Sequence, residues 1–230
     1  MADDVLVVYL ALDGWVEQER AWATSYMRFS SGIEHSLETV RRSVGEPGYD
    51  IGAMLDAAKT AAQKGFSTMV FLGSHSRILA DDWLLKLVEG SEFGAASATG
   101  SYEQGISSYR YNPHLRTNAF AIDPSLLLSL WTEPVMTKRD CHEFEHGDNS
   151  ITRRLVFASH TPVVASTHGV HRMEYWPHSG TYRRFGYQPH LLVADNRTDA
   201  YFSADHATKR HLEQLAWGSN PFIQISDRLS

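Results

Sequence analysis

The sequence predicts a single α/β domain in which a mostly parallel sheet is flanked by helices on both faces. Over the first hundred residues, patterns typical of strands alternate with patterns typical of helices, which is the order that a parallel sheet requires. The length of 230 residues fits one large domain. A hydrophobic fraction of 43% is ordinary for a protein that buries a core.

The first half of the chain carries the clearest signals. The apolar, β-branched run at 5–10 suits a strand that is covered on both faces. Further strands are expected from alternating, apolar or small residues at 37–44, 68–72 and 94–99. The intervening helices are expected at 15–29, 52–64 and 81–88. Gly65 follows the second helix at the C′ position, and residues 45–48 form a turn.

The second half is less regular. Strands are expected at 115–122 and 161–165, and helices at 124–130, 149–158 and about 204–217. Pro124 is a favoured first residue of a helix, and Asp148 suits the N-cap of the helix at 149–158. We find no internal repeat, low-complexity segment or linker that requires a second domain.

Composition narrows the classes of function. The formal net charge of −6 argues against a protein that grips nucleic acid through bulk positive charge. The single cysteine, Cys141, allows no intramolecular disulfide, which favours a cytoplasmic location. No apolar run approaches the roughly 18 residues of a membrane span. A homo-oligomer is compatible with these data.

Ligands of parallel α/β sheets bind beyond the carboxyl ends of the strands. The strand ends expected to matter are therefore residues 9–13, 45–50 and 73–77. Tyr9, Asp50, Ser74 and His75 are the candidate binding residues at these ends.

Two runs of sequence carry a resemblance to a known family. They are Gly48-Tyr49-Asp50-Ile51-Gly52-Ala53 and, after a helix, Phe71-Leu72-Gly73-Ser74-His75-Ser76-Arg77-Ile78-Leu79-Ala80-Asp81-Asp82-Trp83-Leu84. They resemble the nucleotide-binding half of inverting, family-two-like bacterial glycosyltransferases with the GT-A fold, which is Rossmann-like. Residues 94–103, 112–122 and 191–198 are similar to later segments of that family.

The resemblance implies different roles for the two halves of the chain. Residues 1–104 would bind the nucleotide-sugar donor, such as a UDP-sugar, and residues 105–230 would form the acceptor half with a C-terminal extension. The implied activity is transfer of a sugar to an acceptor hydroxyl, with inversion. A glycan, a protein or a modified nucleic-acid base are all open as acceptors.

The metal-binding motif of the family is altered in this chain. The positions of its Asp-x-Asp fall on Gly73 and His75. Glycine offers no side-chain ligand, and Mg²⁺ prefers oxygen to imidazole, so a divalent metal (Mn or Mg) is possible but doubtful. His75 and His168 are the candidate metal ligands. The alternative is that residues 73–76 form a polar turn, and that His168 is a surface histidine.

Sugar transfer also needs a carboxylate that accepts the proton of the attacking hydroxyl. The resemblance places the family's acidic segment on residues 142–148, with Glu145 as the expected base, Asp148 as the second candidate and Glu143 as the third. Asp148 could instead only cap a helix, and Glu145 could be an exposed loop carboxylate.

The remaining candidates are expected to bind the donor. Asp50 would contact the nucleoside, or else cap its helix. Arg116 and Asn118 alternate on the strand expected at 115–122 and so would share one face, either of a pocket or of a half-exposed strand. Arg183 and Arg184 could clamp the diphosphate, since guanidinium matches phosphate, or could be surface charges.

Three functions are compatible with these residues. The first is a glycosyltransferase with Glu145 as base. The second is a non-catalytic module of the same fold that binds a nucleotide-sugar or glycan. The third is a nucleotidyltransferase, because fold alone does not determine function.

Overall fold

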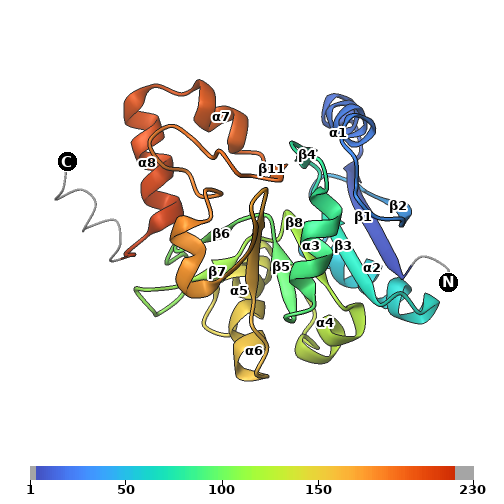
Figure 1. Ribbon diagram of the computed structural model, residues 1–230. Helices are drawn as coiled ribbons and strands as arrows, with labels where there is room; N and C mark the ends of the chain where they lie inside the picture. The colour runs from blue at the N-terminus through green and yellow to red at the C-terminus, as the bar shows by residue number, and fades with distance from the viewer. Residues whose placement is uncertain (1–3, 221–230) are drawn as a thin grey trace.

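The computed structural model describes residues 4–220, and a sheet of seven strands lies at the centre of this part of the chain (Figure 1). The strand order is β10-β9-β5-β8-β3-β1-β2. Strand β1 is parallel to β2 and β3, and β5 is parallel to β9, while β8 lies antiparallel between β3 and β5. The edge strand β10 is antiparallel to β9. The predicted mostly parallel α/β sheet is therefore confirmed.

The strands of the central sheet are β1 (Val5–Leu12), β2 (Ser36–Arg42), β3 (Thr68–Leu72), β5 (Ala95–Ser97), β8 (Ala119–Ile122), β9 (Val163–Ser166) and β10 (Gly169–Arg172). Four shorter strands form two antiparallel pairs, in which β4 (Arg77–Ile78) pairs with β11 (Val193–Ala194) and β6 (Gly100–Ser101) pairs with β7 (His114–Leu115). These pairs tie late segments of the chain to the segments that follow β3 and β5.

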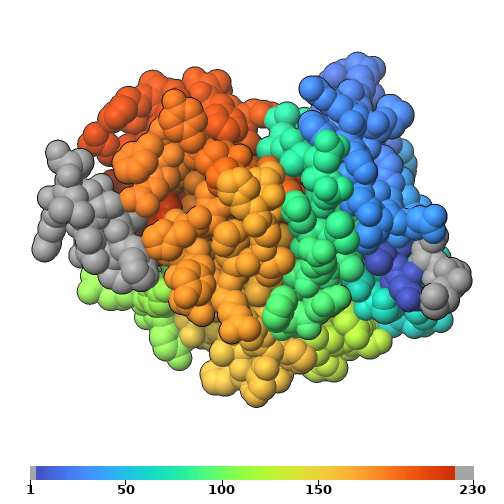
Figure 2. Space-filling model, in the orientation of Figure 1, coloured from blue at the N-terminus to red at the C-terminus, as the bar shows by residue number. Residues whose placement is uncertain are grey.

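The helices are α1 (Val16–Arg28), α2 (Tyr49–Lys64), α3 (Trp83–Ser91), α4 (Pro124–Leu130), α5 (Lys138–His146), α6 (Ile151–Phe157), α7 (Thr198–Ser203) and α8 (His206–Trp217), with a 3₁₀ helix at Met173–His178. Helices α2, α4, α5 and α6 form one layer, and α1 and α3 lie on the opposite side of the sheet (Figure 1). Beside α3 lies chain from the C-terminal half, as Figure 2 shows. No helix within residues 4–220 is long and apolar enough to cross a bilayer.

Strand β1 explains why the sheet is covered on both faces. Successive side chains of a strand point to opposite faces. Leu6 and Val8 pack into the cluster beneath α2 and α4, whereas Val7 and Tyr9 pack into the cluster beneath α1 and α3. All four are at most 1% exposed. The continuous apolar run is thus the pattern of a central strand.

Helices α2 and α5 both begin at residues that line the candidate site. Helix α2 begins after Gly48, whose φ of 86° lies in the left-handed region, and a Cβ there would lie 2.9 Å from the carbonyl oxygen of Val135. Helix α5 begins with a capping box, in which Asp140 N donates to Thr137 Oγ1 and the Asp140 carboxylate accepts from Thr137 N. The predicted glycine end of α2 at Gly65 is confirmed.

Two local predictions and one alternative interpretation are wrong. The strand expected at 115–122 is broken, and Arg116 and Asn118 lie in the gap between β7 and β8, so they are not alternate residues of one strand. Ser150, not Asp148, is the N-cap of α6. Glu145 is not an exposed loop carboxylate, because it lies on α5 with only 16% of its side chain exposed. Helix α5 escaped prediction because most of its residues are charged or polar.

Candidate functional site

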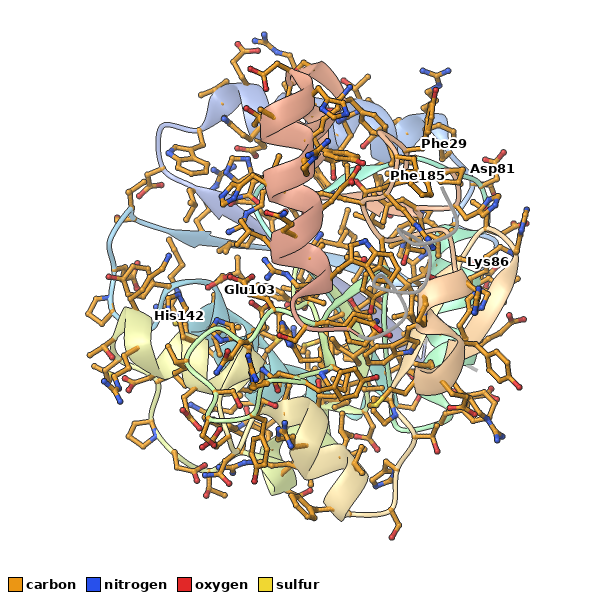
Figure 3. All side chains as sticks on the ribbon, turned by 90° about the vertical axis from the view of Figure 1, so that its left-hand side faces the viewer. Phe29, Asp81, Lys86, Glu103, His142 and Phe185 are labelled. Atoms are coloured by element: carbon orange, nitrogen blue, oxygen red, sulfur yellow. The ribbon has the colours of Figure 1, made fainter. Side chains whose placement is uncertain are left out.

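A cleft of about 730 Å³ lies at the carboxyl ends of the parallel strands. The ends of β1, β2 and β3, the segment before β8, the first turn of α2, one side of α5 and the residues that follow β11 form its walls. Figure 3 labels two of its lining residues, Glu103 and His142. The volume lies within the range of about 300–1,000 Å³ that is usual for small-molecule sites.

The turn after β3 forms one wall of the cleft, to which Ser74 and His75 contribute. Gly73 N donates to the Asn118 carbonyl oxygen at 2.8 Å, and Ser76 Oγ donates to the same oxygen at 2.7 Å. These bonds fix the turn against the segment that leads into β8. The Asn118 carbonyl oxygen therefore anchors this wall at both ends of the turn, at Gly73 and at Ser76.

Tyr9 does not line the cleft, but its hydroxyl contacts the turn that forms this wall. Its ring stacks on Trp22 with a centroid distance of 4.0 Å, and its hydroxyl donates to the Ser74 carbonyl oxygen at 3.1 Å. Burial raises the pKa of Tyr9 to about 12, with Glu19 adding to the effect, so the hydroxyl stays protonated.

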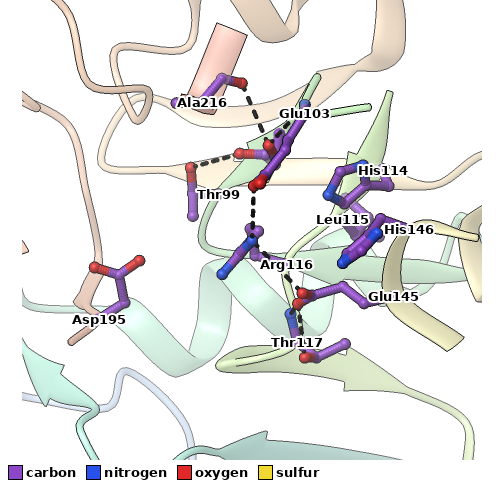
Figure 4. Close-up of polar contacts among 12 residues, drawn as sticks. Thr99, Glu103, His114, Leu115, Arg116, Thr117, Glu145, His146, Asp195 and Ala216 are labelled. Atoms are coloured by element: carbon purple, nitrogen blue, oxygen red, sulfur yellow. Dashed lines mark hydrogen bonds and ion pairs between the residues drawn. The ribbon is translucent and has the colours of Figure 1, made fainter. Parts of the chain in front are cut away.

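Arg116 lies at the centre of a charged network in the cleft (Figure 4). Its guanidinium is 3.5 Å from Glu145 Oε2 and 4.0 Å from Glu103 Oε2. The other oxygen of Glu145 accepts from the backbone N and the hydroxyl of Thr117, both at 2.9 Å. Glu145 is thus held by the residue that follows Arg116 as well as by Arg116 itself.

The network fixes the charge of Glu145. Burial alone would raise the pKa of its carboxyl, but Arg116, His114 and the two bonds from Thr117 outweigh it and lower the pKa to about 2. The charge of Glu145 in turn raises the pKa of Arg116. Both groups are ionised throughout the physiological range.

Asp50 is a second carboxylate of the cleft, in the first turn of α2. It is exposed, and Oδ1 accepts from the neighbouring Ile51 N at 3.1 Å. Although the residue as a whole is exposed, the surrounding cleft walls reduce the hydration of its carboxyl and raise its pKa; the negative charge of Glu145 raises the pKa further, and Lys138 lowers it. Asp50 and Glu145 therefore have opposite electrostatic surroundings in the same cleft.

Two cations of the cleft have no carboxylate partner among residues 4–220. Lys138, at the start of α5, is exposed and lies 5.7 Å from the ring centre of Tyr49. Arg197, just before α7, is half-buried, and its guanidinium makes no ion pair within those residues. By contrast, Arg42 is bound by Glu46 and Asp56.

Three residues expected in the site make other contacts. Asp148 accepts from the hydroxyls of Ser107 and Ser108 at 2.7 and 2.8 Å, and so fastens the loop around residue 107. Arg183 is 8% exposed and pairs with Asp195 at 2.8 Å. Arg184 lies over the rings of Phe185 and Trp217. None of the three lines the large cleft.

The residues present do not fit a divalent metal. No group of three or more His, Cys, Asp or Glu side chains within residues 4–220 could hold a metal ion. His168 is exposed, and the centre of its ring lies 3.7 Å from that of His190. His75 lines the cleft but His168 does not, so the two candidate metal ligands belong to different places. Gly73 and His75 supply no carboxylate oxygens at the turn.

The structure thus brings together Asp50, Ser74, His75, Arg116, Asn118 and Glu145 from the residues singled out in the sequence. Sequence reasoning missed Glu103, Lys138 and Arg197. The signals that could have found them are local: Lys138 lies within a Thr-x-x-Asp capping signature at residues 137–140, and Arg197 comes shortly after the end of an apolar run.

Comparison with known proteins gives no assignment, since no protein-family model matches the chain and no curated protein matches it significantly. The chemistry of the cleft residues is therefore the basis for a function.

Proposed function

We propose that this protein is a glycosyltransferase that moves a sugar from a nucleotide-sugar to an acceptor hydroxyl. The observation that carries the proposal is the cleft of about 730 Å³ at the strand ends, lined by carboxylates and by two cations, Lys138 and Arg197, that have no carboxylate partner among residues 4–220. Such strand-end crevices are the usual ligand sites of open α/β sheets. The resemblance of residues 48–53 and 71–84 to GT-A glycosyltransferases points to the same chemistry.

The diphosphate of the donor needs positive charge, because it becomes the leaving group. Lys138 and Arg197 are suited to this role, since neither has a carboxylate partner among the described residues. Arg116 is less available, because Glu145 and Glu103 already balance its charge. Lys138 and Arg197 would therefore bind the phosphates of the donor, without a metal ion.

The sugar and the nucleoside need hydrogen-bonding groups on the wall. Asn118 lines the cleft, and the polar atoms of its carboxamide have no partner among residues 4–220. A buried amide left without a partner is unfavourable by about 1–3 kcal/mol, so a ligand hydroxyl that bonds to it gains affinity. Ser74 and His75 lie on the adjoining turn.

The chemical step needs a carboxylate beside the attacking hydroxyl. Among the carboxylates that line the cleft, Glu145 and Asp50 differ in their electrostatic surroundings. An in-line attack on the anomeric carbon from the side opposite the diphosphate would invert its configuration.

Calorimetric titration with UDP-, GDP- and dTDP-hexoses tests the proposal, with and without EDTA. We expect one of these donors to bind, with an affinity that EDTA does not change. Arg197→Gln and Lys138→Gln should each weaken its binding by about tenfold or more, as expected for a lost charge-assisted hydrogen bond.

Lys59→Gln is the matched control, because Lys59 is exposed, pairs with Asp56 on α2 and does not line the cleft. It should bind the donor as the wild type does. Absence of binding by every donor would contradict the proposal. Binding without release of nucleoside diphosphate would favour the non-catalytic binding module instead.

A further inference from the structure

We propose that Asp50 is the catalytic residue that accepts the proton of the attacking hydroxyl, and that Glu145 is a positioning residue that holds Arg116. The inference rests on the proposed glycosyl transfer and names the groups that carry out its proton step. It reverses the assignment expected from the resemblance, in which Glu145 is the base.

The oxygens of Glu145 are already engaged. Oε1 accepts two hydrogen bonds from Thr117, and Oε2 faces the guanidinium of Arg116 at 3.5 Å. A carboxylate that received a proton here would leave Arg116 with a weaker partner in a site where its side chain is only 22% exposed. These contacts keep the Glu145 carboxylate ionised.

Asp50 has the opposite geometry. It lies in the first turn of α2, on the cleft wall, and is exposed. Within residues 4–220 its carboxylate accepts hydrogen bonds from two backbone N–H groups, those of Ile51 and of Asp50 itself, and from no side chain. A hydroxyl bound in the cleft can therefore donate to a carboxylate that no cation or side-chain donor already holds.

The charges around Asp50 favour its proton-accepting role. Loss of hydration raises its pKa most, Glu145 raises it further and Lys138 lowers it, while Arg116 is shared with Glu145. Cys141, also on the cleft wall, has a pKa raised to about 12 and is neutral. The net direction for Asp50 is upward, which brings its pKa closer to the operating pH at which a general base works best.

Two carboxylates in one site with pKa values pushed in opposite directions are a recognised sign of divided roles. Here the pKa of Glu145 is lowered and that of Asp50 is raised. The electrostatic cause is partly shared, since the permanent negative charge of Glu145 is one of the reasons that Asp50 holds a proton more readily.

The acceptor oxygen forms a bond to the anomeric carbon, and the bond from that carbon to the diphosphate oxygen breaks. The electron pair of the broken bond stays on the diphosphate, next to Lys138 and Arg197. The hydroxyl proton passes to Asp50, which returns it to solvent after the products leave.

Asp50→Asn and Glu145→Gln separate the two roles. Release of nucleoside diphosphate is measured with the hexose donor that binds, using p-nitrophenyl glycosides as hydroxyl acceptors, and donor affinity is measured in parallel by calorimetry. Asp50→Asn should lower kcat by about 10²–10⁴-fold, the usual contribution of a general base, with donor Kd changed less than about threefold. Glu145→Gln retains Asp50, so it should lower kcat much less than Asp50→Asn does.

The pH profile of kcat provides a readout that a purely structural role would not move. The wild type should lose activity in acid as Asp50 becomes protonated, and in Glu145→Gln this acid limb should move to lower pH because a negative neighbour is gone. Asp50→Glu should have a higher kcat than Asp50→Asn, and the acid limb of its pH profile should differ from that of the wild type. Asp123→Asn is the control, because Asn is an equally good N-cap at α4 and the residue lies outside the cleft.

A kcat that Asp50→Asn lowers by less than about tenfold, or an acid limb that Glu145→Gln leaves in place, would overturn the proton-accepting role of Asp50. Either result would leave the transferase proposal standing if the wild type turns over. Failure of the wild type to bind or turn over any donor would instead overturn the proposed function, and the role of Asp50 with it.

Discussion

Replacement of Glu145 by glutamine should lower the stability of the folded protein at neutral pH. The carboxyl has an ordinary pKa near 4.5 and a pKa of about 2 in the folded chain. At about 1.4 kcal/mol for each pH unit, that difference corresponds to roughly 3 kcal/mol. The glutamine side chain retains the shape but not the charge that faces Arg116.

The effect has a defined pH window. Because the folded pKa lies below the unfolded one, the stabilisation is complete above about 4.5 and is lost as the pH falls toward about 2. Urea unfolding of the wild type and of Glu145→Gln at a series of pH values should therefore show two curves that converge in acid. A difference below about 1 kcal/mol at pH 7, or one that persists unchanged at pH 2, would refute the reasoning.

Glu133→Gln is the matched control for that experiment. Its pKa is also lowered to about 2, first of all by the hydrogen bonds from Arg154, but 51% of its side chain is exposed. Solvent screens such a pair, so the substitution should change stability by no more than about 1 kcal/mol. A loss as large as that of Glu145→Gln would show that burial is not the deciding factor.

Two further predictions concern the walls of the cleft. Asp195→Asn should destabilise the fold by about 3–5 kcal/mol in urea unfolding, because it leaves the buried Arg183 without its partner, whereas Asp199→Asn should have little effect because Asp199 is 76% exposed. Gly105→Ala should lower the melting temperature, since the residue has a φ of 57° and its Cβ would lie 2.0 Å from His146 Nδ1; an unchanged melting temperature would contradict this.

Much of the fold could be predicted from local sequence because the central strands are apolar runs. The strand at 68–72 and the helix at 124–130 match the structure residue for residue, and the helix at 15–29 differs from α1 by one residue at each end. The predictions that failed involve longer-range contacts. Asp148 has the chemistry of an N-cap, but Ser107 and Ser108 donate hydrogen bonds to its carboxylate.

The candidate site could be predicted only in part. Strand ends identified Asp50, Ser74 and His75 because the architecture alone places them in the cleft. The pairing of Arg183 with Asp195 and the stacking of Arg184 on Trp217 depend on how the C-terminal segment folds back, which no local pattern encodes. The contacts that lower the pKa of Glu145 and raise that of Asp50 also join residues far apart in the sequence, so no local pattern predicts them.

Hydrogen–deuterium exchange with and without the hexose donor that binds most tightly tests the central claim, that the strand-end cleft is the donor site. We predict slower exchange in the segments that line it, around 45–51, 73–75, 116–118, 138–146 and 195–197. Exchange should be unchanged at the His168–His190 surface, outside the cleft. Protection confined to that surface, or no protection at 73–75 and 116–118, would contradict the account.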